Sequence, residues 1–261
     1  MRVTILGCGG SAGVPMLGGA AGQGDWGVCD PEEPRNRRSR SSIVVEGADG
    51  RRILVDTAPE LRTQLLSTGI GRIDAIFYTH AHADHVAGLD DVRGLNRVLD
   101  RPIEVFATKA VLDEISTRFQ YAFRPWSPPG FYRPVLLSHP VRAGTRVEIA
   151  GMSLDLFEQV HGGSTTLGFR IGDFSYSTDV VRLDEAAMGV LAGTRTWLVD
   201  CFQRAPHPAH ADLASVRRWA ARLGVTRTIL THMGTDMDWA WLAANLPPGF
   251  EAGHDGMILR L

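Results

Sequence analysis

Three histidines and one aspartate follow a strand-like run within six residues, and this segment limits what the chain can be. The apolar run 76–79 has the length of a buried strand, and His80, His82, Asp84 and His85 come directly after it. Imidazole and carboxylate groups are ligands of zinc and manganese. Two histidines two positions apart can hold one ion, and the Asp-His pair starting the next helix can face a second ion about 3.5–4 Å away. Surface histidines seldom have this spacing by chance, so the segment predicts a two-metal site.

Short strand-like segments around glycine turns predict two mixed sheets with helices between the strands. Alternating apolar pairs flank glycine turns at 42–46 with 52–56, 147–149 with 152–156, and 169–171 with 174–176. Buried strands are expected at 75–79, 197–200 and 228–231, and helices at 59–67, 108–119 and 212–223. The last helix has one apolar face and ends before Gly224. Early and late hairpins with interspersed helices indicate an α+β fold.

Length and composition are those of a globular enzyme. The 261 residues are predicted to form a single domain, 1–261, and the net charge of −2 argues against a partner that is long nucleic acid. No apolar run approaches the roughly 18 residues of a membrane span, and the N-terminus does not read as a signal peptide. Three widely spaced cysteines make no disulfide framework. We therefore expect a cytoplasmic protein with no membrane partner.

The His-x-His-x-Asp-His segment resembles the metallo-β-lactamase superfamily, whose fold is an αββα sandwich with metal ions at one edge of the two sheets. The resemblance implies three further ligands in order, each just after a strand, and His161, Asp179 and His232 stand at these places. Alone, such residues are more often hydrogen-bonding histidines or helix caps, so their order behind the motif carries the inference. The resemblance implies one ion on His80, His82 and His161, a second on Asp84, His85 and His232, and Asp179 as the bridge.

Three branches of the superfamily share this motif. Glyoxalase II-like thioesterases usually have a Thr-Pro-Gly-like turn after the third ligand, whereas Gly-Gly-Ser-Thr-Thr follows His161. β-Lactamases are secreted, and we find no export signal. The opening loop, residues 6–15, is similar to that of phosphodiesterases related to ribonuclease Z and to PhnP. The resemblance to PhnP-type cyclic-phosphate phosphodiesterases spans nearly the whole chain, with matching segments at 24–31, 34–42, 206–210, 233–239, 246–249 and 254–257.

His210 is the candidate catalytic residue outside the metal ligands. It lies two residues before a predicted helix, where PhnP-type enzymes present a catalytic histidine. An imidazole can protonate the leaving alkoxide when a phosphodiester breaks. The alternative is a histidine that caps the helix, and His207 is a second candidate for the catalytic role. Asp84 would orient the nucleophile besides binding its metal.

The resemblance therefore implies a phosphodiesterase that uses two divalent ions, Zn or Mn, to convert a small cyclic ribosyl or nucleotide-derived diester into a phosphomonoester. Ribonuclease Z-like RNA processing remains an alternative, although no segment resembles the long tRNA-binding arm of those enzymes. A glyoxalase II-like thioester hydrolase and a metal- or ligand-binding protein without turnover are the other two alternatives.

Several residues keep two interpretations. Asp56 either supports the metal ligands or caps the following helix. The arginines at 35, 37, 38 and 40 either contact phosphate or belong to a salt-bridged loop. Some PhnP-type proteins hold a structural zinc with cysteines in the first loop, whereas only Cys29 lies between residues 18 and 40 here, which argues against that metal. His254 and Asp255 are candidates to line the site, and loop tryptophans leave room for a homodimer.

Overall fold

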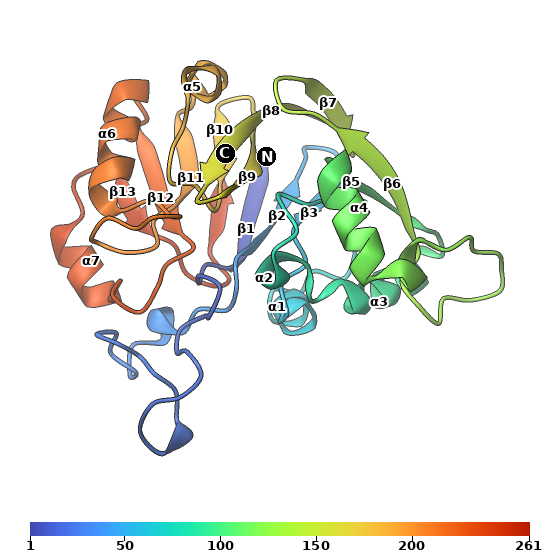
Figure 1. Cartoon of the computed structure of the whole chain (residues 1–261), viewed down its shortest axis with the longest axis horizontal. Coiled ribbons are helices and arrows are strands. Elements are labelled where there is room, and N and C mark those ends of the chain that lie inside the picture. Colours follow the sequence, from blue (N-terminus) through green and yellow to red (C-terminus); the bar gives the residue numbers. More distant parts are fainter.

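The computed structural model describes residues 1–261 and contains two β-sheets that pack face to face, with helices on the outer face of each (Figure 1). This is the αββα sandwich that the resemblance implied, so the predicted fold class is confirmed. None of the helices is both long and apolar enough to cross a membrane.

Each sheet has seven strands. The first has the order β14 (Ile258–Arg260), β1 (Arg2–Gly7), β2 (Ser42–Glu46), β3 (Arg52–Val55), β4 (Ala75–Phe77), β5 (Ile103–Thr108) and β6 (Leu136–Val141). The second has the order β13 (Phe250–Ala252), β12 (Arg227–Thr231), β11 (Thr196–Asp200), β10 (Phe174–Ser177), β9 (Ser164–Ile171), β8 (Met152–His161) and β7 (Arg146–Ile149). Both sheets are mixed: β3 to β6 are parallel, as are β10 to β13, and the remaining pairs are antiparallel.

Seven α-helices and four 3₁₀ turns connect the strands. The helices are α1 (Leu61–Ser67), α2 (Ala83–Val86), α3 (Val92–Leu99), α4 (Lys109–Arg118), α5 (Glu185–Leu191), α6 (Leu213–Leu223) and α7 (Trp239–Asn245). The 3₁₀ turns are Ala20–Gly22, Pro34–Asn36, Leu89–Asp91 and Gln120–Phe123. In Figure 1, α1 to α4 lie beside the first sheet and α5 to α7 beside the second.

Two apolar clusters hold these layers together. Alternation along the strands sends one set of side chains between the sheets, such as Val45 in β2, and the other set under the helices, such as Val44. A cluster of 21 buried residues lies between the first sheet and its helices, and a cluster of 37 fills the space between the sheets and continues under α5 to α7. The loops at the sheet edges are therefore anchored to closely packed, rigid strands.

The expected hairpins and helices are confirmed. β2 pairs with β3, β7 with β8, and β9 with β10, each in antiparallel register. The helix predicted for 212–223 is α6, where the Asp212 side chain accepts a hydrogen bond from the Ser215 N–H and Gly224 ends the helix at φ 67°. Only glycine adopts this left-handed conformation at little cost, which explains the stop.

The long loop between β1 and β2 projects from the sandwich (Figure 1, blue) and is tied down by a buried arginine. The Arg38 guanidinium is 2% exposed and donates hydrogen bonds to the backbone oxygens of Gly234 and Met237. It also contacts the Cys29 sulfur, which lies 3.4 Å from the carbonyl oxygen of Thr235. Cys29 thus takes part in an arginine-centred contact between two loops, and none of the clusters with metal-ligand spacing includes it.

Candidate metal centre

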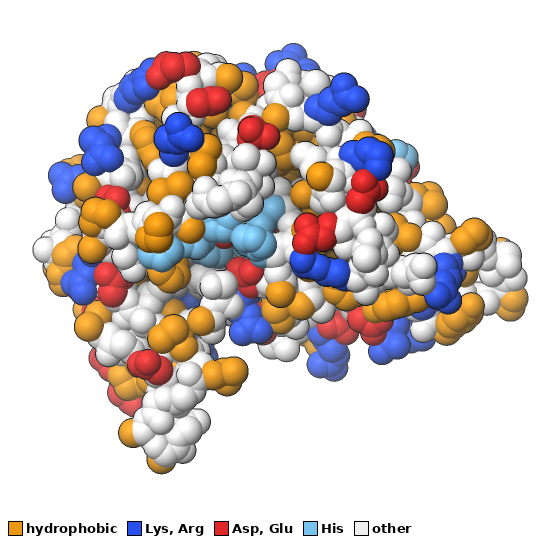
Figure 2. All heavy atoms as spheres, in the orientation of Figure 1, with side chains coloured by type: hydrophobic (Ala, Val, Ile, Leu, Met, Phe, Trp, Pro, Cys, Tyr) orange, Lys and Arg blue, Asp and Glu red, His pale blue; other side chains and the backbone are white.

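The seven predicted ligand residues meet at one edge of the sandwich. His80 and His82 follow β4, and Asp84 and His85 lie in α2, so the first sheet supplies four of them. The second sheet supplies the rest, with His161 at the end of β8 and the other two after β10 and β12. Figure 2 shows the histidine side chains gathered in a hollow on this face. The fold thus brings together residues from four separate segments of the chain.

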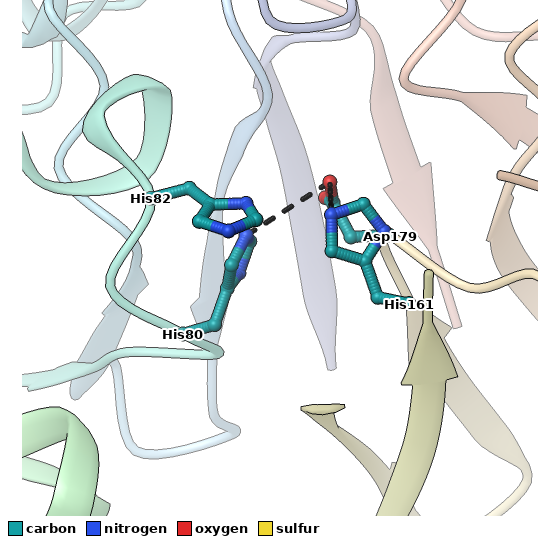
Figure 3. A group of neighbouring side chains, drawn as sticks. All are labelled: His80, His82, His161 and Asp179. Carbon is teal, nitrogen blue, oxygen red and sulfur yellow. Dashed lines mark ion pairs between the residues drawn. The ribbon is translucent and has the colours of Figure 1, made fainter. Parts of the chain in front are cut away.

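The side chains form three overlapping groups of ligand atoms, one of which contains Asp179, His210 and His232. The other two contain the predicted ligands. In the first, shown in Figure 3, His80 and His82 face His161 and Asp179 across a short gap. The second contains Asp84, His85 and His232. Within each group the ligand atoms lie within 4.8 Å of one another. Apart from Asp179, which the resemblance placed between the two ions, these groups match the two sets that the resemblance implied.

Asp179 stands between the two groups and offers one oxygen to each. Its Oδ1 lies 3.9 Å from His80 Nε2 and 3.6 Å from His161 Nε2. Its Oδ2 lies 3.1 Å from His85 Nε2 and 3.4 Å from His232 Nδ1. A carboxylate in this position can bridge two ions, and the hydroxyl of the preceding Thr178 donates to Oδ2 at 2.7 Å and orients it.

The first group is oriented by hydrogen bonds at the Nδ1 atoms. The His161 Nδ1–H donates to the Ala209 carbonyl at 2.8 Å, and because a carbonyl only accepts, Nε2 keeps its lone pair. The Thr79 hydroxyl donates to Asp56 at 2.8 Å and therefore accepts from His80 Nδ1–H at 3.0 Å. Both imidazoles thus present an unprotonated Nε2 to the cluster.

The second group is oriented in the same way. The His85 Nδ1–H donates to the Asp56 carboxylate at 2.7 Å. The Ser41 hydroxyl donates to the Gly9 carbonyl and accepts from His232 Nδ1–H at 3.2 Å. The Nε2 atoms of His85, His232 and His80 are buried without any hydrogen-bond partner. Buried polar atoms without partners are rare in proteins, so these nitrogens fit the donor set of a metal site.

The electrostatics of the cluster favour cations. Burial lowers the pKa of His80 well below its usual value and so favours the neutral imidazole that a metal needs. Burial also acts to lower the pKa of His85, but the carboxylates of Asp179 and Asp56 outweigh it and raise that pKa. Burial would raise the pKa of Asp179, yet the surrounding histidines hold it well below its usual range. Divalent ions would replace the proton that the carboxylates hold on His85 and would be coordinated by an ionised carboxylate and neutral imidazoles.

Three residues of the cluster have a backbone conformation that side chains other than glycine seldom adopt. Asp56, Asp179 and His232 have φ of 62°, 53° and 56°. Each follows a strand directly or within two residues, at the point where the chain turns toward the metal groups. Left-handed residues cost about 1 kcal/mol or more and concentrate at functional sites. Asp and His tolerate this region better than most residues, which helps explain their presence at these turns.

Asp56 supports the ligands and does not cap α1, whose N-cap is Glu60. Its fully buried carboxylate accepts from His85, from the Thr79 hydroxyl and from the Thr79 N–H. We predict that Asp56→Asn lowers metal affinity roughly 10–100-fold, because the outer partners of ligating histidines have effects of this size. Isothermal titration of the metal-free protein would measure this, with Asp49→Asn in an exposed turn as the control. Equal affinities for both variants would contradict this role.

His210 lies beside the metal groups and is paired with a residue that the sequence reasoning missed. Its Nδ1 is 3.0 Å from Oδ2 of Asp200, the last residue of β11, and its ring contacts those of His161 and His232. Asp200 is fully buried, and burial raises its pKa, while burial lowers the pKa of His210. His210 does not cap α6, since Asp212 does so. Its Nδ1 also lies 3.9 Å from Asp179 Oδ1.

The remaining candidates lie outside the cluster. His207 accepts a hydrogen bond from the Ala209 N–H, and His139 stacks on Phe106 in the first sheet. Asp255 accepts hydrogen bonds from the Cys8 and Ser39 backbone, so it joins two loops and does not line the site. His254 lies beside Trp239. Neither His254 nor Asp255 belongs to a group of ligand atoms, and their contacts give no support to the expectation that they line the site.

The arginines at 35–40 are largely engaged within the protein. Arg35 pairs with Glu33 at 2.6 Å, and Arg40 pairs with Glu60 at 2.8 Å. Arg38 is buried, as described above, and Arg37 lies over the ring of Trp26. These contacts favour the interpretation of a salt-bridged loop over that of a phosphate-binding cluster.

Comparison with known proteins places the chain in a family. Residues 51–233 match the family described as "Beta-lactamase superfamily domain", and the chain belongs to it. An octanoyltransferase from Porphyromonas gingivalis is 31% identical over 260 residues, which cover 98% of this chain and 51% of that protein. The chain therefore spans about half the length of that relative.

Among the solved structures that superpose on the chain is one from the PhnP family. A diphosphatase from the PhnP family superposes with a TM-score of 0.88 at 32% identity, covering 100% of this chain and 97% of that one. Zinc-bound PqqB from Methylobacterium extorquens superposes over 100% of both chains with a TM-score of 0.80 at 20% identity, which shows the shared fold. The chain is thus a metallo-β-lactamase-fold hydrolase close to a PhnP-family enzyme.

Proposed function

We propose that the protein is a two-metal phosphodiesterase that hydrolyses a small phosphodiester to a phosphomonoester. The observation that carries the proposal is the pair of ligand groups that share Asp179, with the His210–Asp200 pair directly beside them. Two ions about 3.5–4 Å apart are the arrangement typical of phosphoryl-transfer hydrolases.

The proposed ligands are those that the resemblance implied. His80, His82 and His161 would hold one divalent ion, Asp84, His85 and His232 the other, and Asp179 both. When bound, Zn or Mn ions lower the pKa of water and stabilise the negative charge on phosphoryl oxygens. This donor set of imidazoles and carboxylates suits either metal.

His210 supplies the proton for the leaving alcohol. His210 carries an Nε2–H when its Nδ1 accepts from a protonated Asp200, or when His210 is an imidazolium that donates from Nδ1 to the ionised carboxylate. Asp84, whose Oδ2 lies 3.2 Å from His85 Nε2, orients the attacking water besides holding its ion. Burial would raise the pKa of Asp84, but the neighbouring His85 lowers it below its usual range, so Asp84 stays ionised as an acceptor.

A second candidate is hydrolysis of a diphosphate linkage, which the likeness to the PhnP-family diphosphatase favours. The two reactions differ in their leaving group. A phosphate, with a second pKa near 6, departs without help, whereas an alkoxide needs a proton. The His210–Asp200 pair therefore favours the diester. RNA processing is less favoured, since the net charge of −2 suits a small substrate better than a polyanion.

A panel of substrates tests the proposal. The protein is assayed with Zn or Mn against an alkyl p-nitrophenyl phosphodiester, p-nitrophenyl phosphate, a dinucleoside diphosphate and a thioester. We expect metal-dependent turnover of the diester and little of the monoester. Turnover of the diphosphate alone would replace the proposal with the second candidate, and turnover of the thioester alone would indicate a glyoxalase II-like enzyme.

A further inference from the structure

A cavity of about 200 Å³ opens beside the metal groups and shares His80 and His82 with them. Its other walls come from the start of α4 and from β8 and β9, where these strands leave the seam between the two sheets. The buried Nε2 of His80, which has no hydrogen-bond partner, belongs to this wall. A group bound in the cavity would therefore lie next to a phosphorus atom held at the first metal position.

The cavity wall is polar and acidic and lacks cations. Its lining contains Glu114, Glu158 and several hydroxyl groups, and no lysine or arginine. Arg118, which is not a lining residue, pairs with the Glu114 carboxylate and donates to the Ala81 carbonyl, so Glu158 is the unpaired carboxylate of the lining. Figure 2 shows acidic side chains next to the histidine hollow. A second phosphate or a carboxylate of a ligand would be repelled here.

Two polar side chains of the lining are free to bind. Glu158 forms no ion pair or hydrogen bond, and the same holds for the Thr165 hydroxyl. Glu158 is opposite Leu167 in the β8–β9 pair, and Thr165 precedes Leu167 by two residues on the same face of the sheet. The two groups therefore point to the same side. A carboxylate beside a hydroxyl is a common way to bind the hydroxyls of a sugar, as with ribose in dinucleotide sites.

The position of the cavity decides which ester group it holds. None of the lining residues is His161, His210 or His232. The His210 ring contacts those of His161 and His232, so the proton donor lies outside the cavity lining. In the hydrolysis water adds to phosphorus and releases a proton to solvent, while the P–O bond to one alcohol breaks. That alcohol takes a proton from His210, which solvent then reprotonates. The attacking and leaving oxygens are in line, so the group that stays on phosphorus lies to the side.

We propose that this cavity is the subsite for the retained alcohol of the diester, and that it selects an uncharged polyol or sugar. This proposal rests on the proposed function. The volume is below the roughly 300–1,000 Å³ of pockets for drug-sized ligands, so it suits a glycerol- or pentose-sized group. Glu158 is the specificity-determining residue, because its unpaired carboxylate accepts from hydroxyls and repels anions. The enzyme would then release a sugar or polyol phosphomonoester.

The test uses three phosphodiesters with the same p-nitrophenol leaving group and a different retained group: methyl, 2,3-dihydroxypropyl or 2-carboxyethyl. For the parent protein, we expect the dihydroxypropyl ester to exceed the methyl ester in kcat/KM by about tenfold, chiefly through KM, which corresponds to about one good hydrogen bond to a charged group. We expect the carboxyethyl ester to fall below the methyl ester.

The variants Glu158→Gln and Glu158→Lys are compared by the ratios among the three esters. Glu158→Gln should reduce the preference for the diol, and Glu158→Lys should place the carboxyethyl ester above the methyl ester. The control is Glu148→Lys on the neighbouring strand β7, where the side chain is exposed and the ratios should not change. Unchanged ratios in both Glu158 variants would overturn the subsite while the hydrolysis of the methyl ester still supports the proposed function. No turnover of any ester would overturn both.

Discussion

Asp179→Asn is expected to reduce diester hydrolysis by about 10³-fold or more. Asp179 is the one residue that reaches both ligand groups, with Oδ1 toward His80 and His161 and Oδ2 toward His85. Asparagine has nearly the same shape and tolerates the φ of 53°, so the loss comes from the missing charge. Charge stabilisation by the metals is worth several kcal/mol in such reactions, and each 1.36 kcal/mol is a factor of ten.

Metal content measured by mass spectrometry, together with turnover, checks this prediction. The variant should bind fewer ions than the parent at equal metal concentration, whereas Asp173→Asn in the exposed β9–β10 turn should behave as the parent does. Normal turnover by a metal-saturated Asp179→Asn protein would contradict the bridging role.

His210→Ala is expected to lower kcat for an alkyl diester by about 10²–10⁴-fold, the usual contribution of a general acid, and to leave metal content unchanged. The effect should be much smaller for a p-nitrophenol leaving group, which departs without a proton. His207→Ala serves as the matched control, since its ring lies 5.2 Å from that of His210 in the same loop but makes no contact with Asp200. Equal losses for both leaving groups would show that His210 acts on the metals or on folding.

Because Asp200 contacts His210, we expect the Asp200→Asn substitution to change how the rate of diester hydrolysis depends on pH. Rising pH removes the proton that His210 needs for catalysis, so the rate for an alkyl diester falls on the alkaline side. Burial lowers the pKa of His210, and the carboxylates of Asp179 and Asp84 oppose this. When ionised, the Asp200 oxygen 3.0 Å from His210 Nδ1 would also favour the imidazolium. In Asp200→Asn the fall should therefore begin at a lower pH than in the parent protein. A pH–rate profile of kcat unaffected by this substitution would remove Asp200 from the mechanism.

The sequence predicted the fold and the first four ligands because both are encoded locally. Strand alternation and glycine turns set the hairpins, and His80 to His85 lie on one strand–loop–helix unit. The three distant residues could be placed only through the resemblance, since nothing local distinguishes His161 or His232 from an ordinary buried histidine.

Contacts between distant segments could not be predicted in this way. Ser41 orients His232 across 191 residues, and Arg38 is buried although it lies within a charged run. Asp200 had a usable signal: it ends a buried strand as an acidic residue, as Asp56 does in Ile53-Leu-Val-Asp56. That pattern identifies a residue at the edge of the sheet. Its contact with His210 depends on the path of the loop that follows β11, which the sequence pattern does not give.

The most direct test of the proposed two-metal phosphodiesterase is a metal titration of the metal-free protein. The titration follows hydrolysis of an alkyl p-nitrophenyl phosphodiester. For a two-metal phosphodiesterase we expect no hydrolysis without metal and a rate that rises with added Zn or Mn until two ions are bound per chain. Two bound ions without diester hydrolysis would contradict the proposed activity, and a full rate with one ion would contradict the two-metal site.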